Sequence, residues 1–203
     1  MDKKGRLIVV RHGQTPANIE GVWHGSTDTP LSDLGRQQVK WLGTHFKQVM
    51  VPDVIYASPL QRAHLTALGI AGSQGLEVQL DPRLQEFCLG DWEGVRFEDI
   101  VQIHDPEKRL NHDPDFAPPG GESQRIVQKR MVSAIEEIIQ RHADENVVLV
   151  SHGVALGIAL AHYLHQDTTQ WMNYSHNNTA ISELCPIEKK LLFFNKTDHY
   201  KSQ

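Results

Sequence analysis

Residues 7–15 read Leu-Ile-Val-Val-Arg-His-Gly-Gln-Thr, and this stretch decides the fold. Its run of four apolar residues, three of them β-branched, predicts a buried strand that Gly13 and Pro16 bring to an end. Arg11 and His12 are therefore expected at the carboxyl end of that strand. Ligands bind at this edge of open α/β sheets, because the loops diverge there into a crevice and the following helices point their N-termini at it.

A second stretch repeats the arrangement far along the chain. Residues 147–153 read Val-Val-Leu-Val-Ser-His-Gly, so His152 also follows a β-rich run and precedes a glycine. We predict that the two runs are adjacent parallel strands and that His12 and His152 face one another across them.

The other segments alternate between short β-rich runs and longer stretches with helical spacing of apolar residues. Strands are predicted at 54–57, 77–80, 178–184 and 190–195, and helices between Ser32 and Pro52, from Ser58 onward, over 122–142 and over 153–164. This alternation predicts an α/β fold, a three-layer α/β/α sandwich with a mostly parallel central sheet.

The expected helices also have predicted starts and buried faces. Ser32 is predicted to cap one helix, and Ser58 with Pro59 is predicted to start another, which places Arg62 in its first turn. The apolar residues expected to pack inward are Val39, Leu42, Phe46 and Val49, then Leu65, Leu68, Ile70 and Ala71, then Ile126, Met131, Ile135, Ile138 and Ile139.

The chain of 203 residues is long enough for one buried core and shows no dividing linker, so residues 1–203 are expected to form a single domain. Residues 18–30 are polar and rich in turn formers, and are expected to be loop. Residues 83–121 are expected to hold one short helix near 97–103 and otherwise to form an irregular lid or binding insertion.

Charge and composition limit the partners and the compartment. A net charge of -5 gives no general attraction to nucleic acid or to an anionic membrane surface. No apolar run approaches the length of a membrane span, and the N-terminus runs into a strand, so a cytoplasmic protein is expected. Cys88 and Cys185 are isolated, which favours two thiols but leaves a disulfide open. A homodimer also stays open, because surface patches cannot be located from sequence.

Five residues at predicted strand ends, helix starts or in the irregular segment could converge on one crevice: Arg11, His12, Arg62, Glu86 and His152. Phosphoryl transfer needs a nucleophile, cations that balance the phosphoryl charge, and an acid for the leaving oxygen. Arginine suits the cation's task because its planar fork bonds two oxygens at once. A neutral imidazole fixed through one nitrogen by a backbone carbonyl presents the other as a nucleophile, so His12 is expected to act without a metal.

A series of motifs spans nearly the whole chain. They are Arg-His-Gly-Gln-Thr at 11–15 with Asn18, Gly-Ser-Thr-Asp-Thr-Pro-Leu-Ser at 25–32, Ser-Pro-Leu-Gln-Arg-Ala at 58–63, Leu-Gln-Glu at 84–86, Gly-Asp-Trp-Glu-Gly at 90–94, Gly-Gly-Glu-Ser at 120–123 and Ser-His-Gly at 151–153. In this order the motifs resemble those of the histidine phosphatase superfamily, the phosphoglycerate mutase-like proteins. The resemblance is closer to the small phosphatase branch of this superfamily.

The resemblance implies a phosphoglycerate mutase-like fold and a role for each matching residue. It implies that His12 becomes phosphorylated and that Glu86 donates a proton and later accepts one. Arg11, Arg62 and His152 would bind the phosphoryl group. Asn18 would assist them, although a turn residue is an equally good interpretation of this asparagine.

One departure from the family's mutases favours hydrolysis. Cofactor-dependent mutases of this family follow the acid with Arg-His-Tyr-Gly and carry a longer insertion with paired arginines. Here Phe-Cys-Leu-Gly follows Glu86, and 25 residues separate Gly94 from Gly120. We expect a metal-independent phosphomonoesterase that acts on small phosphorylated metabolites through phospho-His12. Mutase-type transfer and a non-catalytic phosphate-binding module remain alternatives, although a pure binder does not need Glu86.

The sequence says less about which residues contact the rest of the substrate and about what the remaining histidines do. Trp23, His24 and Gly25 are expected to line the substrate mouth. His162 and His165 have metal-ligand spacing on a helix, but the sequence offers no evident third ligand, so neither a metal nor a cofactor is expected.

Overall fold

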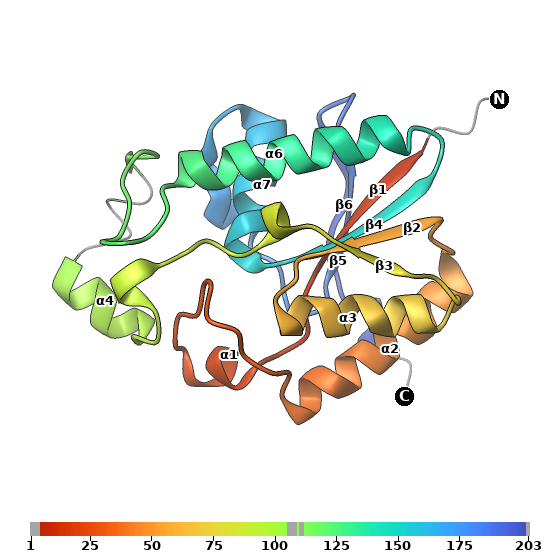
Figure 1. The fold of residues 1–203 in the computed structure, drawn as a ribbon, viewed down its shortest axis with the longest axis horizontal. Helices are drawn as coiled ribbons and strands as arrows, with labels where there is room; N and C mark the ends of the chain where they lie inside the picture. The colour runs from red at the N-terminus through yellow and green to blue at the C-terminus, as the bar shows by residue number, and fades with distance from the viewer. Residues whose placement is uncertain (1–4, 105–108, 110–111, 202–203) are drawn as a thin grey trace.

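The computed structural model describes residues 5–104, 109 and 112–201 (Figure 1). In this part of the chain, six strands form one sheet in the order β3-β2-β4-β1-β5-β6. The strands are β1 (Arg6–Arg11), β2 (Val54–Ala57), β3 (Val78–Leu80), β4 (Asn146–Ser151), β5 (Ile181–Cys185) and β6 (Lys190–Lys196). The first four run parallel, whereas β5 is antiparallel to β1 and β6 to β5. The predicted mostly parallel sheet is confirmed.

Helices cover both faces of this sheet, as Figure 1 shows. On one face lie α2 (Asp33–Val49) and α3 (Gln61–Gly72), and on the other α6 (Gln124–Arg141) and α7 (Gly153–His165). Because successive strand residues point to opposite faces, β1 serves both layers. Ile8 and Val10 pack with residues of α2 and α3, and Leu7 and Val9 pack with residues of α6 and α7. The three-layer α/β/α sandwich is confirmed.

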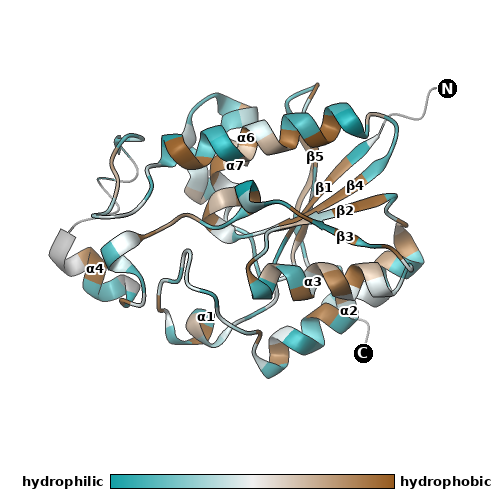
Figure 2. Ribbon diagram, in the orientation of Figure 1, coloured by the Kyte–Doolittle hydropathy of each residue, from teal (hydrophilic) through white to brown (hydrophobic). Residues whose placement is uncertain are grey.

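The outer helices are amphipathic, and hydrophobic and hydrophilic residues alternate along α3 and α6 in Figure 2. By contrast, α7 is apolar almost throughout and most of its residues are buried. Its N-terminus therefore has a fixed place at the carboxyl edge of the sheet, directly after β4.

The pairing of β1 with β4 brings the two predicted histidines together. Arg11 is in register with Ser151, and the His12 amide donates to the Ser151 carbonyl at 3.0 Å. The ring centroids of His12 and His152 are 5.2 Å apart. The predicted meeting of the two histidines across adjacent parallel strands is confirmed.

The predicted inward face of α3 is partly wrong. Leu65 and Leu68 are 39% and 44% exposed, whereas Ala63 and Ala67 are buried beside Ile70. The helices α2 and α3 approach closely, because a Cβ on Gly43 would lie 2.4 Å from the Gly69 carbonyl oxygen. Small residues are therefore needed at the contact, and the leucines turn toward solvent.

Two more residues expected in the core are exposed. Val49 is the last residue of α2 and is 66% exposed, and Ile126 in the first turn of α6 is 52% exposed. The buried stripe of α6 contains Val127, Met131 and Ile138. Their spacing fits one side of a 3.6-residue helix, on which Ile126 is one residue out of phase.

The predicted start of α3 at Ser58 is wrong. The helix begins at Gln61, and its N-cap residue Leu60 makes no side-chain cap. Instead Asp28, from a loop distant in sequence, accepts from the Gln61 amide at 2.8 Å. The Ser58 side chain is therefore not used as a helix cap and instead contacts His152. Arg62 still lies in the first turn of α3.

The irregular segments contain more helix than the sequence predicted. Residues 18–20 belong to α1 (Pro16–Glu20), where Thr15 and Asn18 form a reciprocal capping box. In the segment 83–121, α4 (Phe97–His104) confirms the expected short helix, and two 3-10 turns, η1 (Pro82–Leu84) and η2 (Gly90–Trp92), accompany it. A further turn, η3 (Thr168–Tyr174), was not predicted and packs against α7. Among the described residues, no helix is long and apolar enough to cross a membrane.

Candidate active site

The carboxyl edge of the sheet brings the five candidate residues together. Arg11 ends β1 and His12 follows it, His152 is the N-cap residue of α7, Arg62 lies in α3, and Glu86 follows η1. A cavity of about 290 Å³ opens here, and Arg11, His12, Arg62 and Glu86 line it. His152 is completely buried against His12 rather than part of the cavity lining.

His12 is held in the orientation of a nucleophile. Its Nδ1 lies 2.7 Å from the Gly13 carbonyl oxygen, which only accepts, so Nδ1 carries the proton and Nε2 keeps its lone pair. Burial, and then the nearby charges of Arg62 and Arg11, lower the pKa of His12 well below its usual value. The imidazole is therefore neutral at neutral pH.

Two buried polar atoms beside His12 find no hydrogen-bond partner among the described residues. His152 Nε2 lies 2.7 Å from the Ser58 hydroxyl, but its Nδ1 is unpaired, as is Nε of Arg11. Unpaired buried polar atoms are costly, and each needs an explanation in a native structure. An acceptor atom of a bound ligand would satisfy each of them.

The two arginines are anchored by backbone carbonyls rather than by carboxylates. Arg11 donates from Nη1 to the His176 carbonyl, and Arg62 donates to the carbonyls of Gly25 at 2.7 Å and Thr27 at 2.8 Å. Burial lowers the pKa of both guanidinium groups, and the nearby negative charge of Glu86 acts to raise it. The arginines thus keep their orientation while their charge is left for an anionic ligand.

The loop that anchors Arg62 is itself built around Glu93. This carboxylate accepts from the amides of Gly25, Ser26, Thr27 and Leu89 at 2.8 to 3.2 Å. Burial acts to raise the pKa of Glu93, but these hydrogen bonds and that of the Thr27 hydroxyl lower it. A Cβ at Gly25 would lie 1.9 Å from the Phe87 carbonyl oxygen, so only glycine permits this approach.

The carboxylate of Glu86 lies at the N-terminus of α7. Its Oε1 accepts from the amides of Phe87 at 2.9 Å and Ala155 at 2.8 Å, and its Oε2 accepts from Val154 at 3.1 Å. A helix N-terminus stabilises a carboxylate through its free amides and its dipole. Glu86 is therefore fixed in one position at the cavity wall.

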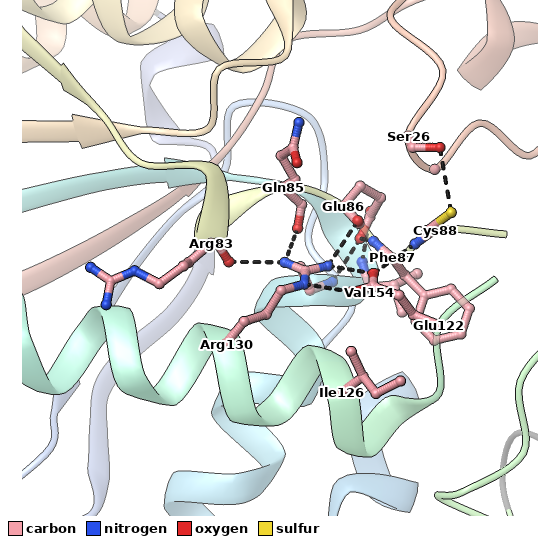
Figure 3. Close-up of polar contacts among 12 residues, drawn as sticks. Ser26, Arg83, Gln85, Glu86, Phe87, Cys88, Glu122, Ile126, Arg130 and Val154 are labelled. Carbon is pink, nitrogen blue, oxygen red and sulfur yellow. Dashed lines mark hydrogen bonds and ion pairs between the residues drawn. The ribbon is translucent and has the colours of Figure 1, made fainter. Parts of the chain in front are cut away.

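The backbone of Glu86 is fixed from the opposite side by Arg130 of α6 (Figure 3). Arg130 donates to the carbonyls of Arg83, Gln85 and Glu86 at 2.6 to 2.9 Å, and its remaining N–H groups bind both oxygens of Glu122. Glu122 in turn accepts from the Cys88 amide at 3.0 Å. One guanidinium, with all five of its N–H donors engaged, thus ties the acidic segment to α6.

The structure also brings the expected substrate-side residues to the cavity. Asn18, Trp23, His24 and Gly25 all line it. The Asn18 side-chain oxygen accepts from the Thr15 amide at 3.1 Å, so Asn18 is both a capping residue and a cavity residue.

Several residues of the site were not assigned a role from sequence: Ser58, Thr66, Glu93, Glu122, Arg130, Trp171 and Met172. Some of them act through hydrogen bonds between distant segments. Thr66, for example, accepts from the Gly13 amide at 3.0 Å and donates to the Arg62 carbonyl at 2.7 Å. The sequence offered a signal only for Ser58, Glu93 and Glu122, which belong to three of the motifs.

Other candidate ligands are used within the structure. His162 bonds to Gln128 and His165 to Tyr174, and the described residues contain no group of three or more His, Cys, Asp or Glu that could hold a metal ion. Cys88 and Cys185 are both free thiols, which settles the question of a disulfide between them.

The site therefore combines a neutral, oriented imidazole with two buried guanidinium groups, a second imidazole and a fixed carboxylate, which defines a phosphoryl-transfer centre. The family model of the histidine phosphatase superfamily (branch 1) matches residues 7–195, and the chain belongs to this superfamily. The predicted family and phosphoglycerate mutase-like fold are confirmed.

Several relatives of this chain carry phosphatase names, and others are named as phosphoglycerate mutases or mutase-like proteins. Phosphoserine phosphatase 1 of Hydrogenobacter thermophilus is 33% identical over 96% of this chain and 93% of its own. Glucosyl-3-phosphoglycerate phosphatase of Mycobacterium tuberculosis is 35% identical over 82% of this chain and 78% of its own. The crystal structure of phosphoserine phosphatase from Entamoeba histolytica with 3-phosphoglyceric acid superposes with a TM-score of 0.87, at 30% identity, over 96% of this chain and 98% of that one. The predicted class of activity, a phosphoric monoester hydrolase, is confirmed.

Proposed function

We propose that this phosphatase hydrolyses small soluble phosphate monoesters in two displacements on His12, without a metal or another cofactor. His12 Nε2 forms a bond to phosphorus while the ester P–O bond breaks, which leaves a phosphohistidine and releases the alcohol. Water then attacks phosphorus, the P–N bond breaks, and inorganic phosphate leaves. The observation that carries the proposal is the His12 imidazole, held neutral and oriented by Gly13 between Arg11 and Arg62.

The surrounding groups would balance the charge of the transferred phosphoryl group. Arg11 and Arg62 supply two positive charges at its oxygens, and His152 Nδ1 and Arg11 Nε supply hydrogen-bond donors that lack other partners among the described residues. Asn18 adds its amide nitrogen. Donors fixed in advance in a buried site stabilise the transition state without the cost of reorganisation.

Glu86 is the proposed acid and base. Its Oε1 already accepts from two amides, whereas Oε2 accepts from one at 3.1 Å, so Oε2 has the capacity to hold a proton. In the first displacement it donates this proton to the leaving alcohol oxygen. In the second displacement the same oxygen takes a proton from the attacking water.

Two further features belong to the proposal. Phe87 and Leu89, from the insertion expected at 83–121, line the cavity, and we propose that the short length of this insertion lets water reach the phosphohistidine. A cytoplasmic location is also proposed, and the two free thiols Cys88 and Cys185 fit a reducing compartment.

The test is release of inorganic phosphate from a panel of monoesters, with EDTA present, by the wild type and by His12→Ala. The control is His142→Ala, since His142 bonds to Tyr56 and Glu145 and does not line the cavity. We expect wild-type and control activity to persist in EDTA and His12→Ala to lose it. Full activity of His12→Ala, or loss of turnover on chelation, would overturn the proposal. Transfer among phosphoglycerates without hydrolysis would favour the mutase alternative.

A further inference from the structure

The cavity beyond the phosphoryl-binding groups has apolar and aromatic walls. Val22 and Trp23 come from the segment after α1, Phe87 and Leu89 from the segment after Glu86, and Trp171 and Met172 from η3. The leaving alcohol of a bound ester would lie among these side chains, because the charged groups occupy the end of the cavity next to His12.

The charged groups of the cavity are already engaged by the proposed reaction. Among the described residues that line it, the charged side chains are Arg11, Arg62 and Glu86. The arginines face the phosphoryl group, and three amides hold the Glu86 carboxylate. His24 adds an imidazole whose buried Nδ1 has no partner among the described residues, so it offers one hydrogen bond to an alcohol or ether oxygen.

A second charge on the substrate would therefore find no partner of opposite charge among the described residues that line the cavity. Burial of an unpaired carboxylate is costly, whereas aromatic walls gain from contact with an apolar or aromatic group. We infer that the enzyme prefers monoesters of uncharged apolar or aromatic alcohols and discriminates against alcohols that carry a carboxylate. This inference rests on the proposed function, and it sets the chain apart from relatives named for phosphoserine or phosphoglycerate derivatives.

The test compares two pairs of substrates in which a carboxylate is either added to the ring or replaces a hydroxymethyl group. One pair is phenyl phosphate and 4-carboxyphenyl phosphate, and the other is glycerol 1-phosphate and 3-phosphoglycerate. We expect kcat/KM to be higher for the uncharged member of each pair, by on the order of tenfold or more. The carboxyl group makes the phenol a slightly better leaving group, so leaving-group chemistry alone would favour the opposite order.

A cation placed in the apolar wall should reverse part of this preference. Met172 is 43% exposed at the cavity, so Met172→Arg can be introduced without a deeply buried charge. We expect Met172→Arg to raise the ratio of kcat/KM for 4-carboxyphenyl phosphate to that for phenyl phosphate by about fivefold, the size of a partly exposed ion pair. The matched variant Met172→Gln, similar in length but uncharged, should leave this ratio unchanged.

The outcomes separate the inference from the function on which it rests. Equal or higher kcat/KM for the carboxylated esters in the wild type would overturn the inference and leave the phosphatase mechanism intact. The same ratio in Met172→Arg and Met172→Gln, with both variants folded by circular dichroism, would also overturn it. A failure of the proposed function would instead appear as no phosphate release from any ester.

Discussion

Arg130 donates from Nη2 to the backbone carbonyl of Glu86 at 2.9 Å. The same guanidinium also binds the carbonyls of Arg83 and Gln85, so it ties the segment of residues 83–86 to the outer helix α6. The carboxylate of Glu86 is meanwhile held by α7. The proposed acid is thus positioned by two helices, one through its backbone and one through its side chain.

Arg130→Lys should weaken acid catalysis although it keeps the positive charge. Lysine has one ammonium group and cannot reproduce the fork that binds three carbonyls and Glu122. A displacement of Glu86 by about 1 Å costs up to about a hundredfold in rate. We expect a large drop in kcat/KM for an alkyl phosphate, whose leaving alcohol needs a proton, and a small drop in kcat/KM for p-nitrophenyl phosphate, measured by steady-state kinetics.

The leaving-group dependence distinguishes positioning from general loss of structure. Arg125→Lys is the matched control, because Arg125 lies on the same helix but pairs with the exposed Asp115. It should behave as the wild type with both esters. An equal loss with both esters in Arg130→Lys would contradict a positioning role.

Glu86→Gln should show the same pattern in stronger form. The amide cannot supply a proton, and a general acid contributes typically about 10²–10⁴-fold. We expect kcat/KM for an alkyl phosphate to fall by that range and kcat/KM for p-nitrophenyl phosphate to fall much less. A uniform loss across esters of different leaving-group pKa would remove Glu86 from the proposed role.

The sequence predicted the reacting residues of the site better than the residues that hold them in position. His12 and His152 could be placed because each follows a strand, and strand ends meet at one edge of a parallel sheet. Arg130 lies within α6 and looks like any other helical arginine in the sequence. Its role depends on hydrogen bonds to a segment 44 to 47 residues away, which no local pattern encodes.

Glu93→Gln should loosen the binding of the phosphoryl group. Glu93 fixes the loop whose Gly25 and Thr27 carbonyls orient Arg62, and its amide variant would place an NH₂ group against backbone donors. We expect a loss of stability of about 1.5–3 kcal/mol, typical for hydrogen bonds to a charged group. The Ki of inorganic phosphate should also rise, which a competition assay measures. Glu98→Gln on α4 is the control, and an unchanged Ki in Glu93→Gln would contradict the role of this loop.

Buried neutral histidines should make the fold sensitive to acid. Burial lowers the pKa of His176 from 6.5 to about 4, with Arg11 acting in the same direction and a hydrogen bond to the Tyr174 carbonyl opposing it. A lowered folded-state pKa means that the unfolded chain binds the proton first, so stability is complete above pH 6.5 and is lost as the pH falls toward 4. For His176 this loss is about 3 kcal/mol.

Urea unfolding at several pH values between 7.5 and 4 checks this expectation. His176→Gln keeps the backbone carbonyl that binds Arg11 but removes the titrating ring. The variant should show a smaller fall in unfolding free energy over this range than the wild type. The same slope in both proteins would show that His176 does not contribute.

The fold itself was largely predictable, and the errors in its predicted core have more than one physical cause. The alternation of strands and helices defined the layers, but Leu65, Leu68 and Ile126 were placed in the core and are exposed. Hydrophobic residues and their spacing along each helix were the basis of those assignments. The contact between α2 and α3 selects small residues because Gly43 and Gly69 nearly touch, and this tertiary constraint is not visible along one helix.

The central claim is that His12 carries the phosphoryl group during turnover, and rapid-quench mass spectrometry tests it most directly. The enzyme is mixed with a saturating phosphate ester, quenched at alkaline pH to preserve phosphohistidine, digested and mapped. We predict phosphorylation at His12 in the wild type, increased in Glu86→Gln with p-nitrophenyl phosphate, because that variant cannot activate water. Turnover with no phosphorylation at His12, or with phosphorylation at another residue, would contradict the account.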